Sequence, residues 1–329
     1  MLGKVKSAYE ILRETWLQSR VPANLRIFDQ LLQLAKRPAD RAGFHRYLED
    51  YPALAQIAVG KDWYHDSASG EMRLDFSSRI FAGGCLRLKL AENQQAVIVY
   101  LPGNISAVEN VFLPGDHVHN MTAVAGKLGM GLAGWDWPLQ GARRDHGLYE
   151  GLKSIYSAER EYSRILPVLG TCLWREMVAE LQFALAQIRR HIGQDRKIHI
   201  VGWSMGGCFA YLAPLLGTDI ATTIAIGSCA SVKDLLAEGK ARVHGYFFYP
   251  LNGMAYFDLE DVVAETLAKK QSVRIIYGEH DAGCLEKTSG ALVHAADEKK
   301  QDLQVTVLPH HGHTFSPIVK QRIVEYLSA

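Results

Sequence analysis

The residues best placed for chemistry are a serine, an aspartate and a histidine, each of which follows an apolar segment. Ser204 lies within Gly202-Trp-Ser-Met-Gly206, directly after a short run rich in β-branched residues at 198–201. A G-x-S-x-G pattern between a strand and a helix is typical of a tight turn that exposes the serine hydroxyl above the edge of a sheet. We therefore predict that Ser204 is a nucleophile; the alternative is an ordinary glycine-rich turn between a strand and a helix.

A serine hydroxyl is a poor nucleophile until a base takes its proton, and an acid must orient that base. Two later apolar runs, 273–277 and 303–308, are followed by groups of these types. Gly278-Glu-His-Asp281 comes after the first run, and Pro309-His-His-Gly-His313 comes after the second. Because reactive groups in parallel sheets lie in loops at the carboxyl ends of strands, we expect both loops to lie close to Ser204.

These stretches resemble the α/β-hydrolase superfamily, most of all its bacterial branch of dienelactone hydrolases, acetyl xylan esterases and related serine carboxylesterases. The matching stretches are Gly202-Trp-Ser-Met-Gly-Gly207, Tyr277-Gly-Glu-His-Asp281 and Gly312-His-Thr-Phe315, with a weaker match from Tyr249-Pro250 to Phe257-Asp258. The order Ser, Asp, His along the chain is the order used by this fold. The resemblance covers roughly residues 70–329 and leaves out the N-terminal part.

The resemblance implies a role for each member of the set. Ser204 matches the family's nucleophile, Asp281 its acid and His313 its base. Glu279 remains an alternative acid, and the two other histidines of the last loop are interpreted as bystanders or substrate contacts. The implied reaction is hydrolysis of a carboxylic ester, or of a related acyl bond, through an acyl-serine intermediate. No metal or organic cofactor is expected.

An acyl-serine reaction also needs backbone donors that stabilise an oxyanion. The N–H of Met205, directly after the nucleophile, is expected to be one donor. The resemblance implies that the second is the N–H of Asn104, in the loop after the apolar run 97–101. The family commonly has His-Gly-X in this loop, whereas this chain has Pro102-Gly103-Asn104, so the sequence departs from the family's pattern at Pro102, although a turn is still expected.

Three further residues are candidate substrate contacts: Trp203, Arg143 and Tyr249. Arg143 could clamp a substrate carboxylate through its two N–H donors. An ion pair with an acidic neighbour in the sequence, or simple surface exposure, is the favoured alternative for it. Tyr249 belongs to an aromatic cluster at 246–257, which either lines an acyl pocket or only packs the segment on the sheet.

The elements that position these residues follow from apolar periodicity. Alternating apolar and charged residues predict two antiparallel strands joined through Ala82-Gly-Gly84. Buried strands are expected at 97–101, 130–134, 198–201, 222–226, 273–277 and 303–308. Helices are expected at about 119–128, 173–192, 258–267, 288–297 and 316–327 and directly after Ser204. Strands that alternate with helices predict an α/β fold, with a mostly parallel sheet covered on both faces.

The chain is divided into an N-terminal helical extension, residues 1–55, and a catalytic domain, residues 56–329. Helical periodicity in 6–50 predicts three helices, the third at about 40–49. This extension could pack on the outside of the domain, cover the active site or hold a homodimer together.

Composition limits the class of partner. The sequence has 36 Lys+Arg against 35 Asp+Glu, so neither a nucleic acid nor an acidic membrane is an expected partner. No apolar run has the length of a signal peptide or of a membrane span. Five scattered cysteines predict reduced thiols in a cytoplasmic protein.

A small acyl compound is the expected substrate. Thioester cleavage or acyl transfer is the enzymatic alternative, and a non-catalytic binding module is the less favoured one.

Overall fold

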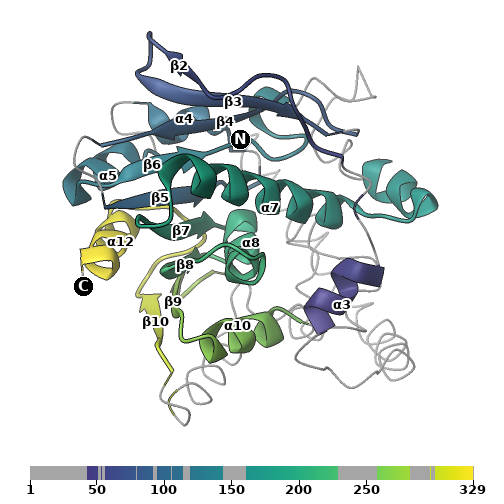
Figure 1. Ribbon diagram of the computed structural model, residues 1–329. Helices are drawn as coiled ribbons and strands as arrows, with labels where there is room; N and C mark the ends of the chain where they lie inside the picture. The colour runs from purple at the N-terminus through teal and green to yellow at the C-terminus, as the bar shows by residue number, and fades with distance from the viewer. Residues whose placement is uncertain are drawn as a thin grey trace, which may run out of the picture.

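The computed structural model describes residues 43–50, 53, 56–78, 80–91, 95–104, 106–113, 119–143, 161–228, 258–281, 297 and 301–328. The first two predicted helices of the N-terminal extension lie outside these ranges. Within them a ten-stranded sheet runs through the centre of the molecule (Figure 1), in the order β1-β3-β4-β6-β5-β7-β8-β9-β10, with β2 paired to β3. The strands are β1 Ala58–Val59, β2 Tyr64–Asp66, β3 Glu71–Ser77, β4 Gly84–Lys89, β5 Ala96–Leu101, β6 Gly131–Gly134, β7 Lys197–Trp203, β8 Thr222–Ile226, β9 Ser272–Gly278 and β10 Leu303–Leu308.

The sheet is parallel from β6 through β5, β7, β8 and β9 to β10. At its other edge β3 and β4 form the predicted antiparallel hairpin, and β4 pairs antiparallel with β6. Parallel strands have all their carboxyl ends on one side of the sheet, where the strands end. The loops after β5, β7, β9 and β10, which carry the candidate site residues, therefore begin at the same edge of the sheet.

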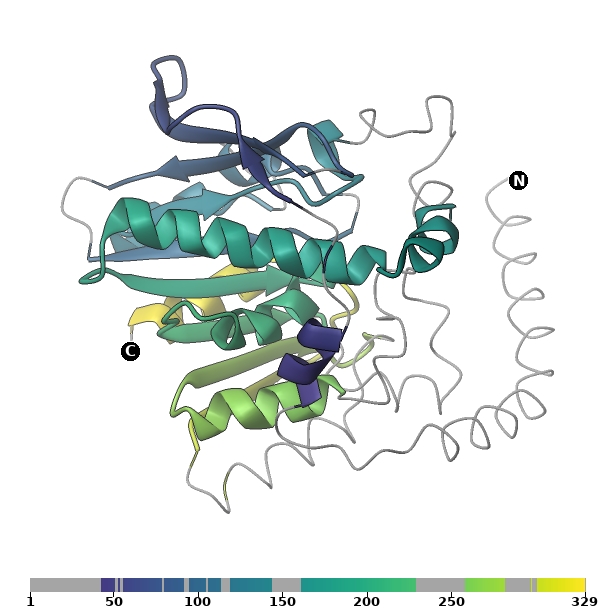
Figure 2. The ribbon, with the colours of Figure 1, turned by 45° about the vertical axis from the view of Figure 1, so that its right-hand side comes forward.

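Helices cover both faces of the sheet, as predicted. Figure 2 shows α7, α8 and α10 in front of the sheet and α12 behind it. The helices are α3 Gly43–Asp50, α4 Glu109–Phe112, α5 Thr122–Leu128, α7 Leu173–Ile192, α8 Met205–Leu212, α10 Leu259–Ala268 and α12 Pro317–Ser328, with short 3₁₀ helices at Gly141–Arg143, Leu166–Leu169 and Ala213–Leu215. Of the predicted helix at 288–297, only residue 297 is described, and it is helical.

Two hydrophobic cores lie on the two faces because successive strand residues point in opposite directions. Val97, Val99 and Leu101 of β5 belong to the core under α7, α8 and α10. Ile98 and Tyr100, from the same strand, belong to the core under α5 and α12. A strand that is buried on both faces reads as a continuous apolar run, which is why β5 was predictable from the sequence.

Helix α3 confirms the third predicted helix and packs on the body of the protein. Phe44 is 2 % exposed and Tyr47 is fully buried, and both rings meet Trp174 at the start of α7 edge to face, with centroids 6.3 and 5.7 Å apart. His45 Nε2 lies 3.5 Å from Glu265 Oε1 on α10. This part of the predicted N-terminal extension therefore shares the main hydrophobic core.

No helix in the described part of the chain has the length and apolar character needed to cross a membrane. Three cysteines are described, Cys85, Cys172 and Cys208, and none of the three forms a disulfide within the described part of the chain. Cys172 and Cys208 are buried, and burial raises the pKa of the Cys85 thiol to about 12.

Candidate active site

Ser204 lies in a strained turn between β7 and α8. Its backbone has φ 52° and ψ −114°, and positive φ is rare for a residue other than glycine. The flanking glycines are required by close backbone approaches. A Cβ at Gly202 would lie 2.2 Å from the Gly206 carbonyl oxygen, and one at Gly206 would lie 2.0 Å from that of Leu101. The turn is also held through the Ser204 N–H, which donates to Ile226 O of β8 at 2.7 Å.

Three candidate residues from three strand ends form one hydrogen-bonded chain. Ser204 Oγ lies 2.9 Å from His313 Nε2, and His313 Nδ1 lies 2.9 Å from Asp281 Oδ2. The Asp281 side chain is 2 % exposed, whereas that of His313 is 43 % exposed. A buried carboxylate, an imidazole at the surface and a hydroxyl in this order have the geometry that lets a serine pass its proton to a histidine.

Backbone hydrogen bonds tie the loop after β9 to the loop after β10. Glu279 N–H donates to Leu308 O at 3.0 Å, and His280 N–H donates to His311 O at 2.8 Å. The two loops approach so closely at Gly278 that a Cβ there would lie 2.2 Å from His311 O. This pairing fixes the position of Asp281 relative to His313.

Trp203 lies next to the candidate base and is not an open binding surface. Its indole is 8 % exposed and packs against the His313 ring, with centroids 4.6 Å apart and planes inclined by 32°. Phe315 meets the indole edge to face at 5.5 Å. The contact restricts rotation of the imidazole. We therefore interpret Trp203 as a residue that positions His313, and its predicted substrate contact stays a prediction.

His119 is a second aromatic neighbour of Trp203, at a centroid distance of 6.1 Å, and the sequence did not single it out. Its Nδ1 lies 3.0 Å from Tyr100 Oη, and its Nε2 lies 3.5 Å from Ser106 Oγ. Burial, with a smaller effect of Lys320, lowers the pKa of His119 to about 4. The ring therefore contacts the site through Trp203 and is held in place by Tyr100 and Ser106.

Gly227 is another residue that sequence reasoning missed. It follows β8 with φ +56°, and a Cβ there would lie 3.2 Å from both Asp281 Oδ2 and His313 Cε1. A side chain at this position would press on the contact between the acid and the base. The available signal was a glycine directly after the predicted strand at 222–226.

The two candidate oxyanion donors lie on elements that pack against each other. Met205 is the first residue of α8, where helix N–H groups have no intrahelical acceptor. The loop of Asn104 is held by Trp137, whose Nε1–H donates to Pro102 O at 3.0 Å. The Asn104 side-chain oxygen accepts from Gln140 Nε2 at 2.6 Å. This contact links the loop of Asn104 to Gln140, and the backbone N–H of Asn104 stays the predicted donor.

Arg143 requires a correction, because its guanidinium is buried and is satisfied within the protein. The side chain is 1 % exposed, and its NH1 and NH2 groups donate to the Glu180 carboxylate at 2.6 and 2.9 Å. NH1 also donates to Asp136 O, and the Nε–H donates to Ala82 O, both at 3.1 Å. A group in this setting cannot clamp a substrate carboxylate. Arg143 does form an ion pair, but with Glu180, 37 residues away, whereas the sequence suggested an acidic neighbour along the chain.

Tyr249, the remaining candidate substrate contact, lies outside the described residues, as does the whole cluster at 246–257.

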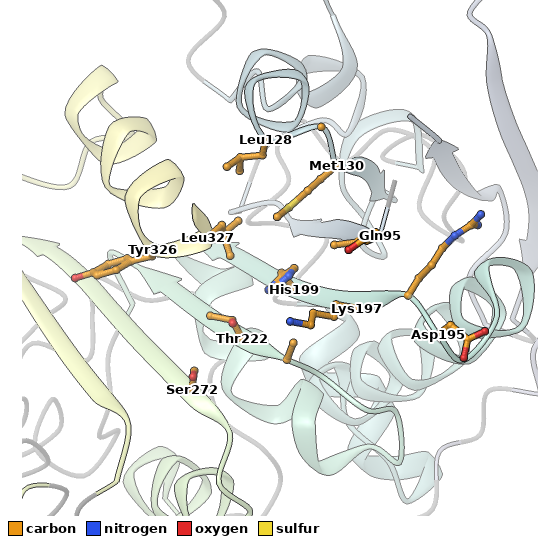
Figure 3. A pocket seen from close by; sticks show the side chains of 14 residues that line it. Gln95, Leu128, Met130, Asp195, Lys197, His199, Thr222, Ser272, Tyr326 and Leu327 are labelled. Atoms are coloured by element: carbon orange, nitrogen blue, oxygen red, sulfur yellow. The ribbon is translucent and has the colours of Figure 1, made fainter. Parts of the chain in front are cut away.

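A cavity of about 1000 Å³ opens at the amino ends of the parallel strands, on the side of the sheet opposite to Ser204 (Figure 3). It is lined by residues at the amino ends of the parallel strands, among them Gln95, Lys197, His199, Thr222 and Ser272. Ser204, Asp281 and His313 lie at the carboxyl ends of these strands, so this cavity is remote from the candidate chemistry. Beside Asp281 the structure has a void of only about 10 Å³.

Comparisons with known proteins give matches only among solved structures, because no family model and no curated protein matches this sequence. Acetyl xylan esterase 1 from Thermoanaerobacterium sp. JW/SL YS485 has a TM-score of 0.53 at 16 % identity, over 87 % of this chain and 93 % of that chain. The esterase Pf2001 from Pyrococcus furiosus has a TM-score of 0.50 at 13 % identity, over 85 % and 92 %. An S-formylglutathione hydrolase from Staphylococcus aureus has a TM-score of 0.46 at 11 % identity, over 84 % and 99 %.

These identities are low, so the likeness concerns the fold, and of these three structures the first two reach a TM-score of 0.50. The chain has an α/β fold with a mostly parallel, mixed sheet, and this fold is that of the α/β-hydrolases. Its structural neighbours are esterases of that class. The predicted fold class is thereby confirmed, whereas the roles of individual residues remain predictions.

Proposed function

We propose that this protein is a serine hydrolase that cleaves a carboxylic ester, or a related acyl bond, of a small molecule. One observation carries the proposal: the hydrogen-bonded chain of Ser204 Oγ, His313 and Asp281, with 2.9 Å at each contact. The positive φ of Ser204 supports it, because strained backbone of this kind persists at functional sites where the surrounding structure holds it in place. The esterase names of the structural neighbours are consistent with an ester as the substrate.

In the proposed reaction Ser204 Oγ attacks the acyl carbon while His313 Nε2 takes the hydroxyl proton. Asp281 accepts the hydrogen bond of His313 Nδ1–H, which holds the required tautomer and stabilises the imidazolium ion that forms. His313 then gives the proton to the leaving alcohol, and an acyl-Ser204 ester remains. In the second half His313 takes a proton from water, the resulting hydroxide attacks the acyl carbon, and Ser204 leaves with a proton returned from His313.

Negative charge develops on the carbonyl oxygen in both halves of this reaction. We assign its stabilisation to the backbone N–H groups of Met205 and Asn104. The N-terminus of α8 contributes through the partial positive charge of its unpaired amides. Loss of one oxyanion donor typically costs roughly 10²–10³ in kcat.

A fluorophosphonate probe tests the nucleophile directly. The protein should gain the mass of the probe on the peptide that contains Ser204, and Ser204→Ala should abolish both labelling and hydrolysis of p-nitrophenyl esters. Ser228→Ala is a matched control, because this buried serine lies near α8 and bonds to Tyr211 Oη at 3.3 Å. The probe should label the Ser228→Ala variant to the same extent as the natural protein. Labelling that persists in Ser204→Ala would remove Ser204 from the mechanism, and a panel of esters with rising acyl length would define the substrate class.

A further inference from the structure

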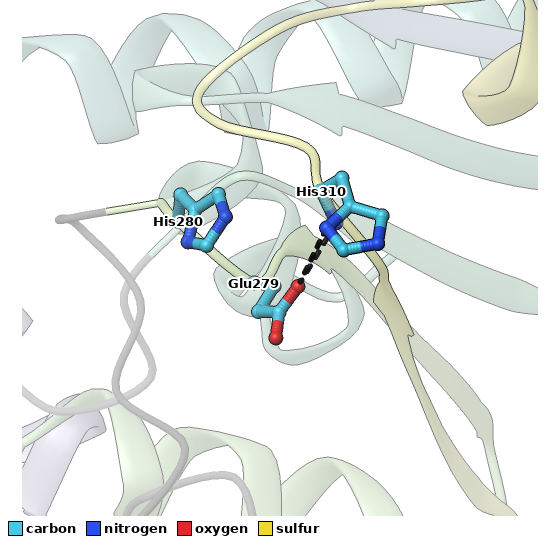
Figure 4. A group of neighbouring side chains, drawn as sticks. All are labelled: Glu279, His280 and His310. Carbon is cyan, nitrogen blue, oxygen red and sulfur yellow. Dashed lines mark hydrogen bonds and ion pairs between the residues drawn. The ribbon is translucent and has the colours of Figure 1, made fainter.

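Two histidines and a glutamate gather on the outer surface of the paired loops that carry Asp281 and His313. Glu279 and His280 come from the loop after β9, and His310 comes from the loop after β10 (Figure 4). One potential ligand atom from each side chain lies within 4.8 Å of those of the other two. In the described part of the chain, this is the group of histidine, cysteine and acidic side chains that has a spacing suited to a metal ion.

We propose that Glu279, His280 and His310 bind a divalent transition-metal ion of the Zn²⁺ type, with water in the fourth position. Two imidazole nitrogens and one carboxylate oxygen are ligands that Zn²⁺ accepts readily, and three protein ligands plus water is a common zinc arrangement. Mg²⁺ and Ca²⁺ fit poorly, because they require six or more oxygen ligands.

The spacing needs only small side-chain movements. Bonds of about 2.0–2.2 Å to a tetrahedral Zn²⁺ place neighbouring ligand atoms about 3.3–3.5 Å apart. Glu279 Oε2 and His310 Nδ1 are already 3.8 Å apart. The side chains of His310 and Glu279 are 90 % and 50 % exposed, so they are free to rotate by the remaining distance.

The backbone beneath the cluster is fixed before any ion binds. Glu279 N–H and His280 N–H each donate to the facing loop, at 3.0 and 2.8 Å. The Glu279 carboxylate in turn accepts the His310 N–H at 2.9 Å. A backbone that is already fixed loses less conformational entropy on binding, which favours a specific site over a chance surface contact.

An ion at this cluster would join the loop of the candidate acid to the loop of the candidate base. His280 is adjacent to Asp281 in the chain, and His310 precedes His313 by three residues. The ion would take no part in acyl transfer, since His313 and Asp281 lie on the inner side of the loops. Its expected effect is to stabilise this edge of the molecule, and the inference stands or fails independently of the proposed hydrolase activity.

The test measures zinc binding to the full-length, chelator-treated protein by isothermal titration calorimetry, together with Tm. One equivalent of Zn²⁺ should bind, and Tm should rise by about 3–5 °C at a free Zn²⁺ concentration 100 times the Kd. Glu279→Gln, His280→Ala and His310→Ala should each raise the Kd at least tenfold and remove the Tm shift.

Two matched variants locate the ion. His311→Ala changes a histidine of the same loop whose Nδ1 contacts Pro309 O at 2.8 Å, and it should bind Zn²⁺ like the natural protein. His313→Ala should also keep the binding, because the proposed cluster does not include it. Unchanged affinity in both His280→Ala and His310→Ala, loss of binding in His313→Ala alone, or no binding below millimolar Zn²⁺ would overturn the proposal.

Discussion

Asp281 and Glu279 are separated by one residue in the same loop, yet their carboxylates point to different surroundings. The Asp281 side chain is 2 % exposed, and its Oδ2 contacts His313 Nδ1 at 2.9 Å. The Glu279 side chain is 50 % exposed and accepts the backbone N–H of His310. The two side chains point in different directions because the turn after β9 directs Asp281 inward and Glu279 to solvent. The geometry therefore favours Asp281 as the acid in the proposed mechanism.

Asp281→Asn should lower kcat for p-nitrophenyl ester hydrolysis by about 10⁴, a magnitude known from the serine-protease triad, because the amide stabilises the wrong imidazole tautomer. Glu279→Gln should change kcat by less than tenfold, since this side chain does not contact His313. Steady-state kinetics on both variants, with circular dichroism to verify folding, provide the measurement. A larger loss in Glu279→Gln than in Asp281→Asn would contradict the assignment of the acid.

Gly206→Ala should disrupt the turn that carries Ser204. The added Cβ would lie 2.0 Å from Leu101 O and 2.7 Å from Pro102 O, and neither backbone atom can move without disturbing β5. Overpacking of this kind typically costs about 1–3 kcal/mol or more of unfolding free energy. We expect a lower Tm and a fluorophosphonate labelling rate that falls at least a hundredfold.

The matched control for this substitution is Gly126→Ala in α5, where a Cβ would meet nothing within 4 Å. Alanine in a helix interior is favoured over glycine by about 0.5–1 kcal/mol, so Tm should stay or rise slightly. If Gly206→Ala behaved like this control, the close packing of the turn would not be needed for labelling.

Removal of Arg143 should destabilise the fold without a specific effect on substrate binding. Burial raises the pKa of Glu180 and Arg143 opposes that rise, so Arg143→Met leaves an uncompensated buried carboxyl group. Breaking a buried pair by removing one partner costs about 3–5 kcal/mol. Urea denaturation should show this loss, while KM of the protein that remains folded should stay unchanged. A raised KM with normal stability would restore the substrate role.

The partner of Arg143 allows a sharper version of this experiment. The double variant Arg143→Met/Glu180→Leu should recover part of the lost stability, because no buried charge is left unpaired. Arg164→Ala is the control on the surface. Its pair with Glu161 leaves the arginine side chain 66 % exposed, and exposed pairs contribute only about 0–1 kcal/mol.

The N-terminal boundary of a stable protein should lie before α3. A protein that begins at Ala53 lacks Phe44 and Tyr47, whose rings are buried against Trp174. Loss of one large aromatic side chain from a core costs about 3–5 kcal/mol, so this truncation should lower Tm strongly or make the protein insoluble.

A protein that begins at residue 41 keeps α3 with Phe44 and Tyr47, so it should be more stable than the protein that begins at Ala53. Its preference for acyl chain length then tests the predicted covering role of residues 1–40. An unchanged preference and kcat/KM would exclude that role, whereas a broadened preference with normal probe labelling would support it.

His199 should make the protein less stable in mild acid. Burial, with a smaller effect of Lys197, lowers the pKa of His199 to about 4, below the ordinary histidine value of about 6.5. Between these two values the unfolded chain binds a proton that the folded protein does not. The unfolding free energy therefore decreases as pH falls through this window, by at most about 1.4 kcal/mol per pH unit for this group.

His199→Gln should flatten this decrease in urea titrations between pH 4.5 and 7. His65→Gln, which replaces an exposed histidine on β2, should follow the pH dependence of the natural protein. Parallel curves for the natural protein and His199→Gln would assign the acid sensitivity to other groups.

The sequence by itself determined the order and type of most described elements. The alternation around Ala82-Gly-Gly84, the apolar runs of β5, β8 and β10 and the amphipathic pattern of α7 are local features, and each was predicted to within a few residues. Position at a strand end was enough to nominate the loops that carry Ser204, Asp281 and His313, because parallel strands have their carboxyl ends on one side, and the resemblance to the α/β-hydrolases selected the individual residues.

Tertiary structure decided which distant residues meet. Arg143 forms an ion pair with Glu180 on α7, and the Tyr47 ring packs edge to face on Trp174. The Glu279 carboxylate accepts the backbone N–H of His310, which lies 31 residues further along the chain. These contacts depend on the order of the strands in the sheet and on which face each helix covers. A local pattern fixes the direction of a side chain relative to its own element, but the partner is set only when the elements pack. For that reason the sequence could nominate Arg143 as a functional residue, while only the fold revealed that its charge is buried and paired.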